Sequence, residues 1–285
     1  MLKFLKQARS AISMLNPNEV RQLAGRRLVV GLVAETHTAY VEMEDFLTPA
    51  AVSHERRMQV MQSVYRASDR GIPDKYDLVL YEQGLPCPDT AFTFFRDDPA
   101  RTVDEIVSAR DDLWLPLARS FYPFRKPVVD RMVTSVAREN GLFAVASALP
   151  NVVPSFLELP WSIGEFASDT AFITMNQVRM AFLIAAASDK PVGYDKQVAE
   201  LVSIAAGAFG WRALARELVG FIPAGGGLLP KGAIAFAATY VLGKGLEHFH
   251  GVGYGYTRSE RRDAYQVAYE RGKDMLGAVL RRREA

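Results

Sequence analysis

The chain has 285 residues, enough for one large domain or two smaller domains that each bury a core. Its 49% hydrophobic content excludes a disordered chain, and 34 basic against 32 acidic residues give a formal charge of +2, with no overall signal for nucleic acid. The single cysteine, Cys87, excludes an internal disulfide and is compatible with a reducing compartment.

Residues 1–19 are predicted to form a basic amphipathic N-terminal helix. Its apolar stripe consists of Leu5, Ala8, Ile12 and Leu15. Its cations are Lys3, Lys6 and Arg9. The segment lacks the continuous apolar run and the cleavage site of a signal peptide, so export is not expected. Such a helix can lie on an anionic membrane surface through its three cations. Docking on the rest of the protein is the alternative that the pattern leaves open.

Residues 20–125 are predicted to form a small α/β region. The apolar run 28–34 and the shorter run 76–81 are strand candidates. Their alternation with helical segments predicts a parallel pair or a fragment of a doubly wound sheet. Helices are expected at residues 38–47, 50–69 and 101–120.

The turn after the first predicted strand leads into a predicted helix, which is where phosphate-binding loops lie. It reads Ala34-Glu-Thr-His-Thr38, which offers neither the glycines nor the lysine of a P-loop and adds a carboxylate. The glycine-containing segments 243–245 and 251–255 also fail the spacing of nucleotide-binding turns. We therefore expect no catalytic residues, no cofactor and no metal in this chain, while its status as an enzyme stays open.

The remaining residues, 126–285, are predicted to form a helical domain after a break at residues 121–127. The fold class predicted for the whole chain is mainly α, a C-terminal helical bundle with a small N-terminal α/β region. Helical segments are expected at residues 128–149, 156–188 (as one or two helices), 194–222, 231–250 and 259–283. The third and fourth of these are expected to form a helical hairpin around residues 223–230, and the last to lie on the surface or against a partner.

None of these helices is predicted to span a bilayer, because the uncharged stretches are too short or contain prolines. The hairpin either dips into one leaflet or packs in a soluble core. Its small residues, Gly232 and Gly243 among them, allow close approach of helices in either setting. The residues expected to contact the membrane are Lys3, Lys6, Arg9, Phe221, Leu228 and Leu229.

Polar residues inside the apolar helices form a second candidate site. Glu165 and Asp169 are four residues apart and share a helix face. Paired carboxylates can share a proton or bind a metal, and the alternative is that they pair with arginines to hold the bundle in register. The full predicted cluster is Glu165, Asp169, Gln177, Arg179, Arg212 and Arg216. His248 and His250 point to different helix faces, which favours a role at the helix C-terminus over metal binding.

From Val128 to His250 the order of features resembles the domain-of-unknown-function family 697, a helical module of some Era-like bacterial GTPases and bacterial inner-membrane proteins. The segments that carry the resemblance are residues 148–150, 176–180, 207–216, 221–223 and 237–244. The resemblance implies membrane association and a link to a GTPase. Because this chain has no P-loop, that GTPase would be a separate partner.

The sequence thus predicts a non-catalytic, membrane-associated helical protein that acts through a partner, with a GTPase as one candidate. We expect it in the cytoplasm, peripheral to or partly inserted in the inner membrane, without a nucleic-acid partner. One alternative is a soluble enzyme or small-ligand-binding protein with a cleft between the α/β and helical regions. Another is a soluble scaffold that forms homo-oligomers through its C-terminal helix.

Overall fold

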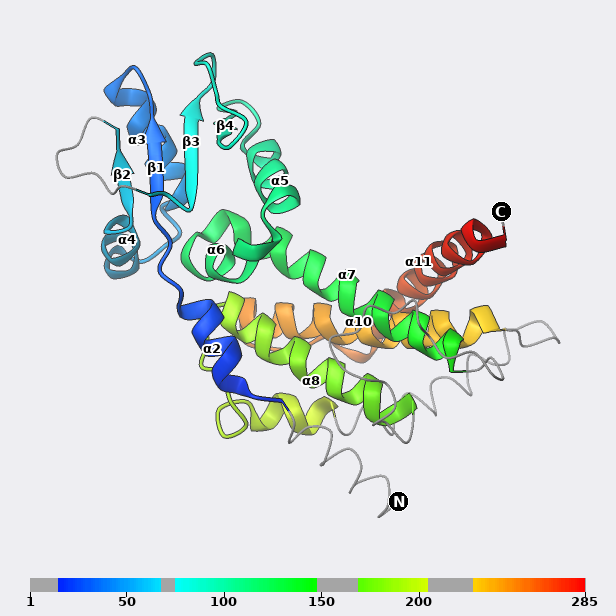
Figure 1. The fold of residues 1–285 in the computed structure, drawn as a ribbon. Coiled ribbons are helices and arrows are strands. Elements are labelled where there is room, and N and C mark those ends of the chain that lie inside the picture. Colours follow the sequence, from blue (N-terminus) through cyan, green and yellow to red (C-terminus); the bar gives the residue numbers. More distant parts are fainter. Residues whose placement is uncertain (1–14, 68–74, 148–168, 205–227, 285) are drawn as a thin grey trace. The chain divides into compact units, whose positions relative to one another are not determined.

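The computed structural model describes residues 15–67, 75–147, 169–204 and 228–284 (Figure 1). It is mainly α with a small parallel sheet in the N-terminal region, which confirms the predicted fold class. The chain forms two compact units. Within the described residues, the sheet unit comprises 19–129 and 186–190, and the helical unit comprises the remaining residues. The division falls inside a long helix, after Val129.

The sheet unit alternates short strands with helices. Its elements are α2 (Pro17–Gly25), β1 (Val30–Val33), α3 (His37–Leu47), α4 (His54–Met61), β2 (Val64–Arg66), β3 (Leu78–Glu82), β4 (Phe92–Phe94), α5 (Pro99–Ala109), the 3-10 helix η1 (Asp111–Leu113) and α6 (Trp114–Ser120). The four strands are parallel and lie in the order β2-β1-β3-β4. The predicted parallel pair is β1 and β3, in which Val30 pairs with Leu78.

The expected helix at 50–69 is wrong in its second half, because β2 begins at Val64. Val64 and Tyr65 are β-formers that pair with β1, and this pairing across the sheet overrides the local helical pattern. Strand β4 was not predicted either, since three residues are too few to show an alternating pattern.

The core of the sheet unit lies between the strands and the helices packed on them. Helices α3, α4 and α5 contact β1, β2 and β4 respectively. Leu32 of β1 and Leu80 of β3 are fully buried, as are Met43 and Leu47 on one face of α3. These side chains fix the position of α3, and therefore of the polar residues on its other faces.

Four long helices make up most of the described part of the helical unit. They are α7 (Tyr122–Ala146), α8 (Asp169–Ala187), α10 (Leu228–Val252) and α11 (Arg258–Glu284). Residues 198–204 are also helical, and the rest of the helix predicted at 194–222 lies outside the described residues.

The helical pattern is not interrupted at residues 121–127 as predicted, because α7 begins at Tyr122 and continues through Pro127. The division between the two units lies close to the predicted domain boundary, after Val129. A proline in the first turn of a helix removes an N–H that has no partner there, so Pro123 fits the start of α7. Pro127 removes a single backbone bond inside the helix. The fully buried side chains of Phe124 and Val128 hold this part of α7 in place.

Helices α7 and α10 approach each other closely at two glycines. A Cβ placed on Gly232 would lie 2.9 Å from the carbonyl oxygen of Gly141 and 2.5 Å from Val145 Cγ2. Farther along α10, a Cβ on Gly243 would lie 2.7 Å from Val133. Small residues of α10 thus do permit close packing, as predicted, but the described neighbour at these contacts is α7.

Helix α11 packs on α10 rather than lying free on the surface. Tyr265 and Ala268 of α11 form a buried cluster with Ala237 and Val241 of α10. Helix α8 is buried on nearly all sides, since residues 171–187 are buried except for the half-buried Arg179 and Leu183. A helix that is apolar all round belongs in the centre of a bundle.

In the portion of the chain that the structure describes, no helix combines the length and apolarity needed to cross a membrane. Of the predicted membrane-contact residues, Lys3, Lys6, Arg9 and Phe221 lie outside the described residues. Leu228 is the first residue of α10, and Leu229 is half-buried.

Candidate functional site

The carboxyl edge of the parallel sheet is the first place to seek a site. Sheets of this kind bind ligands beyond the carboxyl ends of their strands, where the chain switches from one side of the first strand to the other. In the order β2-β1-β3-β4 this switch lies between β1 and β3. The segments that meet there are the turn from Ala34 to Thr36, which leads into α3, and the end of β3 at Glu82.

A carboxylate of the protein occupies the turn between β1 and α3. The backbone N–H of Glu35 donates a hydrogen bond of 2.9 Å to Glu82 Oε2. The hydroxyl of Thr36 caps α3 by accepting a hydrogen bond of 3.1 Å from the N–H of Ala39. Glu35 and Glu82 place two negative charges at the turn, which disfavours a phosphate there.

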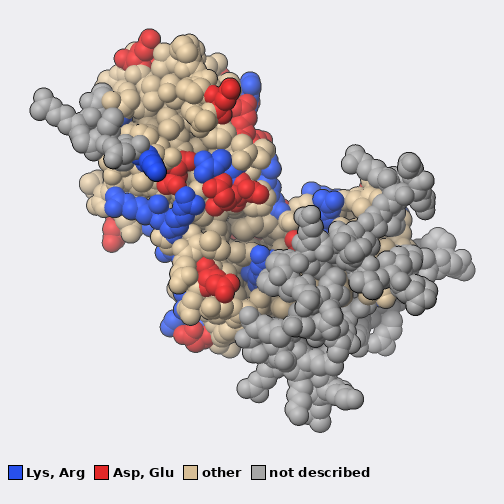
Figure 2. Space-filling model, viewed as in Figure 1, with Lys and Arg blue, Asp and Glu red and all other residues tan. Residues whose placement is uncertain are grey.

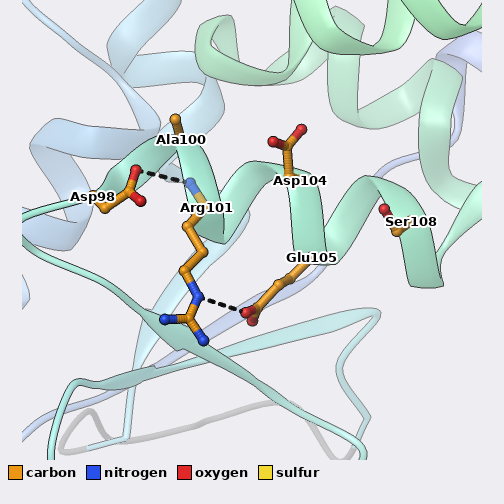
Figure 3. Close-up of a pocket in the computed structure, with 6 residues that line it drawn as sticks. All are labelled: Asp98, Ala100, Arg101, Asp104, Glu105 and Ser108. Atoms are coloured by element: carbon orange, nitrogen blue, oxygen red, sulfur yellow. Dashed lines mark hydrogen bonds and ion pairs between the residues drawn. The ribbon is translucent and has the colours of Figure 1, made fainter.

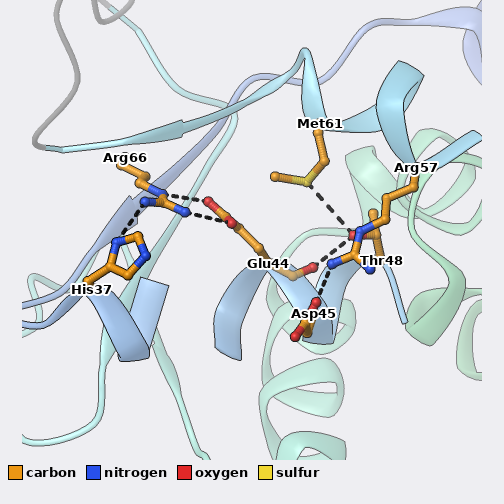
Figure 4. A network of polar contacts seen from close by, with 7 residues as sticks. All are labelled: His37, Glu44, Asp45, Thr48, Arg57, Met61 and Arg66. Carbon is orange, nitrogen blue, oxygen red and sulfur yellow. Dashed lines mark hydrogen bonds and ion pairs between the residues drawn. The ribbon is translucent and has the colours of Figure 1, made fainter. Parts of the chain in front are cut away.

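The acidic residues of α3 are held by arginines that come from other elements (Figure 4). Glu44 makes two hydrogen bonds with Arg66, the last residue of β2, at 2.6 and 2.8 Å. Asp45 pairs with Arg57 of α4. Glu42 pairs with Arg96, which follows β4, and the hydrogen bond and charge of Glu42 raise the pKa of that guanidinium.

His37 joins this network through Arg66. Its Nδ1 lies 3.2 Å from Arg66 Nη1, and the guanidinium also lies over the ring of Tyr40, 5.4 Å from its centroid. The sequence shows His37 as an isolated histidine; only the pairing of β2 with β1 brings it to Arg66. Figure 2 shows that basic and acidic side chains of the sheet unit adjoin one another on the face that it draws.

A shallow depression lies along α5 (Figure 3). Its lining residues are Asp98, Ala100, Arg101, Asp104, Glu105 and Ser108. Asp98 caps the helix by accepting from the N–H of Arg101 at 3.2 Å, and Arg101 Nε donates to Glu105 at 2.9 Å. All of these residues belong to one helix and its cap, so a ligand would be held from one side only. Asp98 is thus the N-cap of α5.

The described part of the helical unit contains a cluster of uncharged polar side chains. Asn140 Nδ2 donates to Thr239 Oγ1 at 2.9 Å, and Gln177 Nε2 donates to the same oxygen at 3.2 Å. Asn176 Nδ2 donates to Asn140 Oδ1 at 2.9 Å. All four residues are buried, and they join α7, α8 and α10. We call Asn140, Asn176, Gln177 and Thr239 the amide cluster.

The amide cluster contains one residue of the polar cluster predicted from sequence. Of the predicted members, Gln177 belongs to it, and the half-buried Arg179 lies near Glu139 of α7. Burial raises the pKa of Glu139, while the charge of Arg179 and a hydrogen bond from Ser135 oppose this rise. Glu165, Arg212 and Arg216 lie outside the described residues, and Asp169 is the first residue of α8. Sequence reasoning missed Asn140 and Thr239, whose only signal is a polar residue inside an apolar helical pattern.

A buried acid and histidine lie near the end of α10. His250 Nε2 is 3.6 Å from Glu200 Oε2, and Gln197 Nε2 donates to the same carboxylate oxygen at 2.5 Å. Gln197 Nε2 also donates to the carbonyl of Ala181 on α8 at 3.2 Å. These contacts connect residues 198–204 to α8 and α10. The position of His250 in the last turn of α10 agrees with the predicted location at a helix C-terminus.

Lys244 is the centre of a group of ion-paired side chains in the helical unit. Its ammonium hydrogen-bonds the carboxylates of Asp130 on α7 and Glu247 on α10. Burial lowers the pKa of Lys244, but the hydrogen bonds and charges of the two carboxylates outweigh it and raise that pKa overall. Glu247 therefore serves in this ion pair. Across the described ranges, no three His, Cys, Asp or Glu side chains gather in a way that could hold a metal ion.

Cys87 lies in the loop between β3 and β4, between Pro86 and Pro88. Its thiol is half-buried and lies 3.7 Å from the carbonyl oxygen of Pro88.

Comparison with protein-family models, with curated proteins and with solved structures gave no match to this chain.

Proposed function

We propose that this chain is a non-catalytic helical protein that works at the surface of the inner membrane through a partner protein, with a separate GTPase as the partner class. One observation carries the non-catalytic part. At the carboxyl edge of the sheet, where this strand order would place a ligand, the polar groups are engaged with one another.

The engagement is extensive around the switch between β1 and β3. The carboxylate of Glu82 accepts a hydrogen bond from the N–H of Glu35, which a phosphate would otherwise approach. The hydroxyl of Thr36 accepts a hydrogen bond from the N–H of Ala39. Arg66, the charge best placed at the end of β2 to attract a phosphate, makes two bonds to Glu44. A nucleotide would have to displace a bidentate ion pair and approach two carboxylates, which favours a structural role for this unit.

Membrane association is supported by the sequence of the N-terminus and by the resemblance to family 697. Lys3, Lys6 and Arg9 are the cations proposed to meet anionic lipid. The helical unit adds a bundle whose helices pack through glycines, a mode of contact common among helices of membrane proteins.

The test of the membrane proposal is fractionation of cells that express the chain. The pellet is washed separately with concentrated salt and with alkaline carbonate. We expect recovery in the membrane fraction, with release by salt because salt screens the attraction between the N-terminal cations and anionic lipid. The triple variant Lys3→Gln/Lys6→Gln/Arg9→Gln should shift the protein to the soluble fraction. The matched control Arg138→Gln/Lys190→Gln/Lys75→Gln removes three cations elsewhere and should not.

Recovery of the wild-type chain in the soluble fraction alone would overturn the membrane proposal. The non-catalytic proposal is tested separately by calorimetric titration of the purified chain with GTP and Mg²⁺. We expect no saturable heat of binding. Saturable binding that is lost in Arg66→Gln would show that the sheet edge is a nucleotide site after all.

A further inference from the structure

The turn between α10 and α11 gathers exposed apolar side chains. Phe249, Val252 and Tyr254 are 37%, 53% and 63% exposed and lie within six residues of one another. Phe249 and Val252 are three residues apart, so they share one face of the last turn of α10. Most of α10 before them is buried, half-buried or packed on α7 and α11. We call residues 249–262 the α10–α11 turn.

The backbone of this turn is fixed at both ends. Gly253 adopts a φ of 90°, and its N–H donates to the carbonyl of Phe249 at 2.8 Å, which closes α10. Thr257 begins α11 with a capping box: its N–H donates to Glu260 Oε2 at 2.8 Å, and its hydroxyl accepts from the N–H of Glu260 at 3.3 Å. The exposed side chains therefore stand on a defined turn.

Aromatic contacts hold the turn against α10. The ring of His248 lies 5.3 Å from the ring of Tyr254 and 5.1 Å from that of Tyr256, measured between centroids. Tyr254 keeps most of its surface exposed despite this contact. Because Tyr254 is already held in place, it loses less conformational entropy when it makes a further contact.

Exposed arginines follow the apolar residues at the start of α11. Arg258 and Arg262 are four residues apart and lie on one side of the helix. Among the described residues, neither guanidinium has a hydrogen-bond or ion-pair partner, whereas Arg261 Nη2 donates to the carbonyl of Tyr256 at 3.2 Å. These two arginines are thus free to bind anions.

The carboxylates next to these arginines in the sequence lie on other sides of α11. With about 100° per residue, Glu260 and Asp263 fall roughly 100° or more from Arg258 and Arg262 around the helix axis. Glu260 is also directed back to Thr257, and its hydrogen bonds with Thr257 lower its pKa. Arg258 and Arg262 therefore lie on a different side of α11 from these carboxylates.

We propose that the α10–α11 turn is a second membrane-contact surface, which seats Phe249, Val252 and Tyr254 at the apolar boundary of an anionic bilayer and Arg258 and Arg262 among its headgroups. The inference rests on the proposed function and adds a contact site to it. Aromatic and aliphatic side chains next to arginines complement a lipid interface, which offers apolar and anionic layers side by side. Nucleic acid would use the arginines but gives Val252 no role.

The test is flotation of the purified full chain with vesicles of phosphatidylcholine, alone or mixed with phosphatidylglycerol. Val252→Ser/Tyr254→Ser should weaken partition into the mixed vesicles about tenfold, because it removes the apolar contact. The matched control is Leu23→Ser/Val267→Ser, which changes side chains that are 59% and 72% exposed elsewhere in the chain. The control should bind as wild type does.

The charge half of the proposal has its own pair of variants. Arg258→Gln/Arg262→Gln should abolish the preference for vesicles that contain phosphatidylglycerol, and the control Arg138→Gln/Lys190→Gln should keep it. Circular dichroism of each variant should match wild type, since all of these side chains are exposed.

The outcomes separate this inference from the proposed function. If the turn variants bind vesicles as wild type does while Lys3→Gln/Lys6→Gln/Arg9→Gln does not, the turn is not a contact surface and the membrane function stands. If the wild-type chain is membrane-bound in cells and ignores vesicles, a protein receptor holds it and the inference fails. Unchanged binding of Arg258→Gln/Arg262→Gln to the mixed vesicles would also overturn the inference.

Discussion

The sheet unit and the helical unit differ in how they keep polar side chains inside the fold. In the sheet unit, charged residues pair at partly exposed positions around α3, as Glu44 and Arg66 do. In the helical unit, uncharged amides and a hydroxyl are buried together between three helices, as Asn140 and Thr239 are. Water can replace a partner in the first arrangement, but it has little access to the second. The same number of lost hydrogen bonds should therefore cost more in the helical unit.

The largest loss of stability is expected at Gly232, where an added Cβ would overlap atoms of α7. Gly232→Ala should lower the free energy of unfolding by about 3 kcal/mol, because the added methyl would meet the backbone oxygen of Gly141. Urea denaturation measures this change. The control is Gly251→Ala, also in α10, where a Cβ meets nothing within 4 Å and helix propensity alone should stabilise by up to about 1 kcal/mol. Equal stability of the two variants would refute close packing of α7 and α10.

The amide cluster should give the next largest effect. Thr239→Val keeps the shape of the side chain and removes the oxygen that accepts from Asn140 and Gln177. Two buried donors lose their partner, so the expected loss is about 2 kcal/mol. Thr239→Ser keeps the oxygen, removes a methyl group, and should cost about 1 kcal/mol. If the valine variant were the more stable of the two, the cluster would not be a stabilising network.

The sheet unit should respond less to the loss of an ion pair. Glu44→Gln leaves Arg66 with a weaker acceptor, and because both side chains are partly exposed the expected loss is about 1 kcal/mol. The loss should shrink in concentrated salt, which screens the pair. Glu105→Gln, which breaks a more exposed pair with Arg101, is the control and should change stability by a few tenths of a kcal/mol, about the value of an exposed helix pair. A loss in Glu44→Gln as large as in Thr239→Val would erase the difference between the units.

The contrast also explains how far the sequence predicts this molecule. Local periodicity predicts α10 and α11 to within a few residues of their observed ends, because each helix satisfies its own backbone. Strands β2 and β4 escape prediction because three-residue strands exist only through their neighbours in the sheet. The continuation of α7 through Pro127 depends on the burial of Phe124 and Val128, which the sequence does not show.

The candidate sites follow the same rule. Gln177 and Arg179 could be predicted because they interrupt an apolar helix, but their neighbours could not. Thr239 lies 99 residues from Asn140 along the chain, so only the packing of α10 on α7 brings the two together. At the sheet edge, Glu82 reaches the N–H of Glu35 through the pairing of β3 with β1.

The smallest effect concerns Glu139, an acid of the helical unit whose pKa is raised by burial. Burial raises the pKa of Glu139 above its ordinary value of 4.5, and Arg179 and Ser135 offset only part of this. Because the native pKa is the higher one, the unfolded chain releases the proton first, and native stability falls as the pH rises through the native pKa. The glutamine side chain in Glu139→Gln does not titrate, so this pH-dependent loss of stability is absent from the variant. The variant should therefore gain stability relative to wild type between about pH 4 and pH 8, as measured by urea denaturation across that range. A difference that stays constant over the range would mean that Glu139 is solvated in the native protein, and that the helical unit admits water to its charged residues as freely as the sheet unit does.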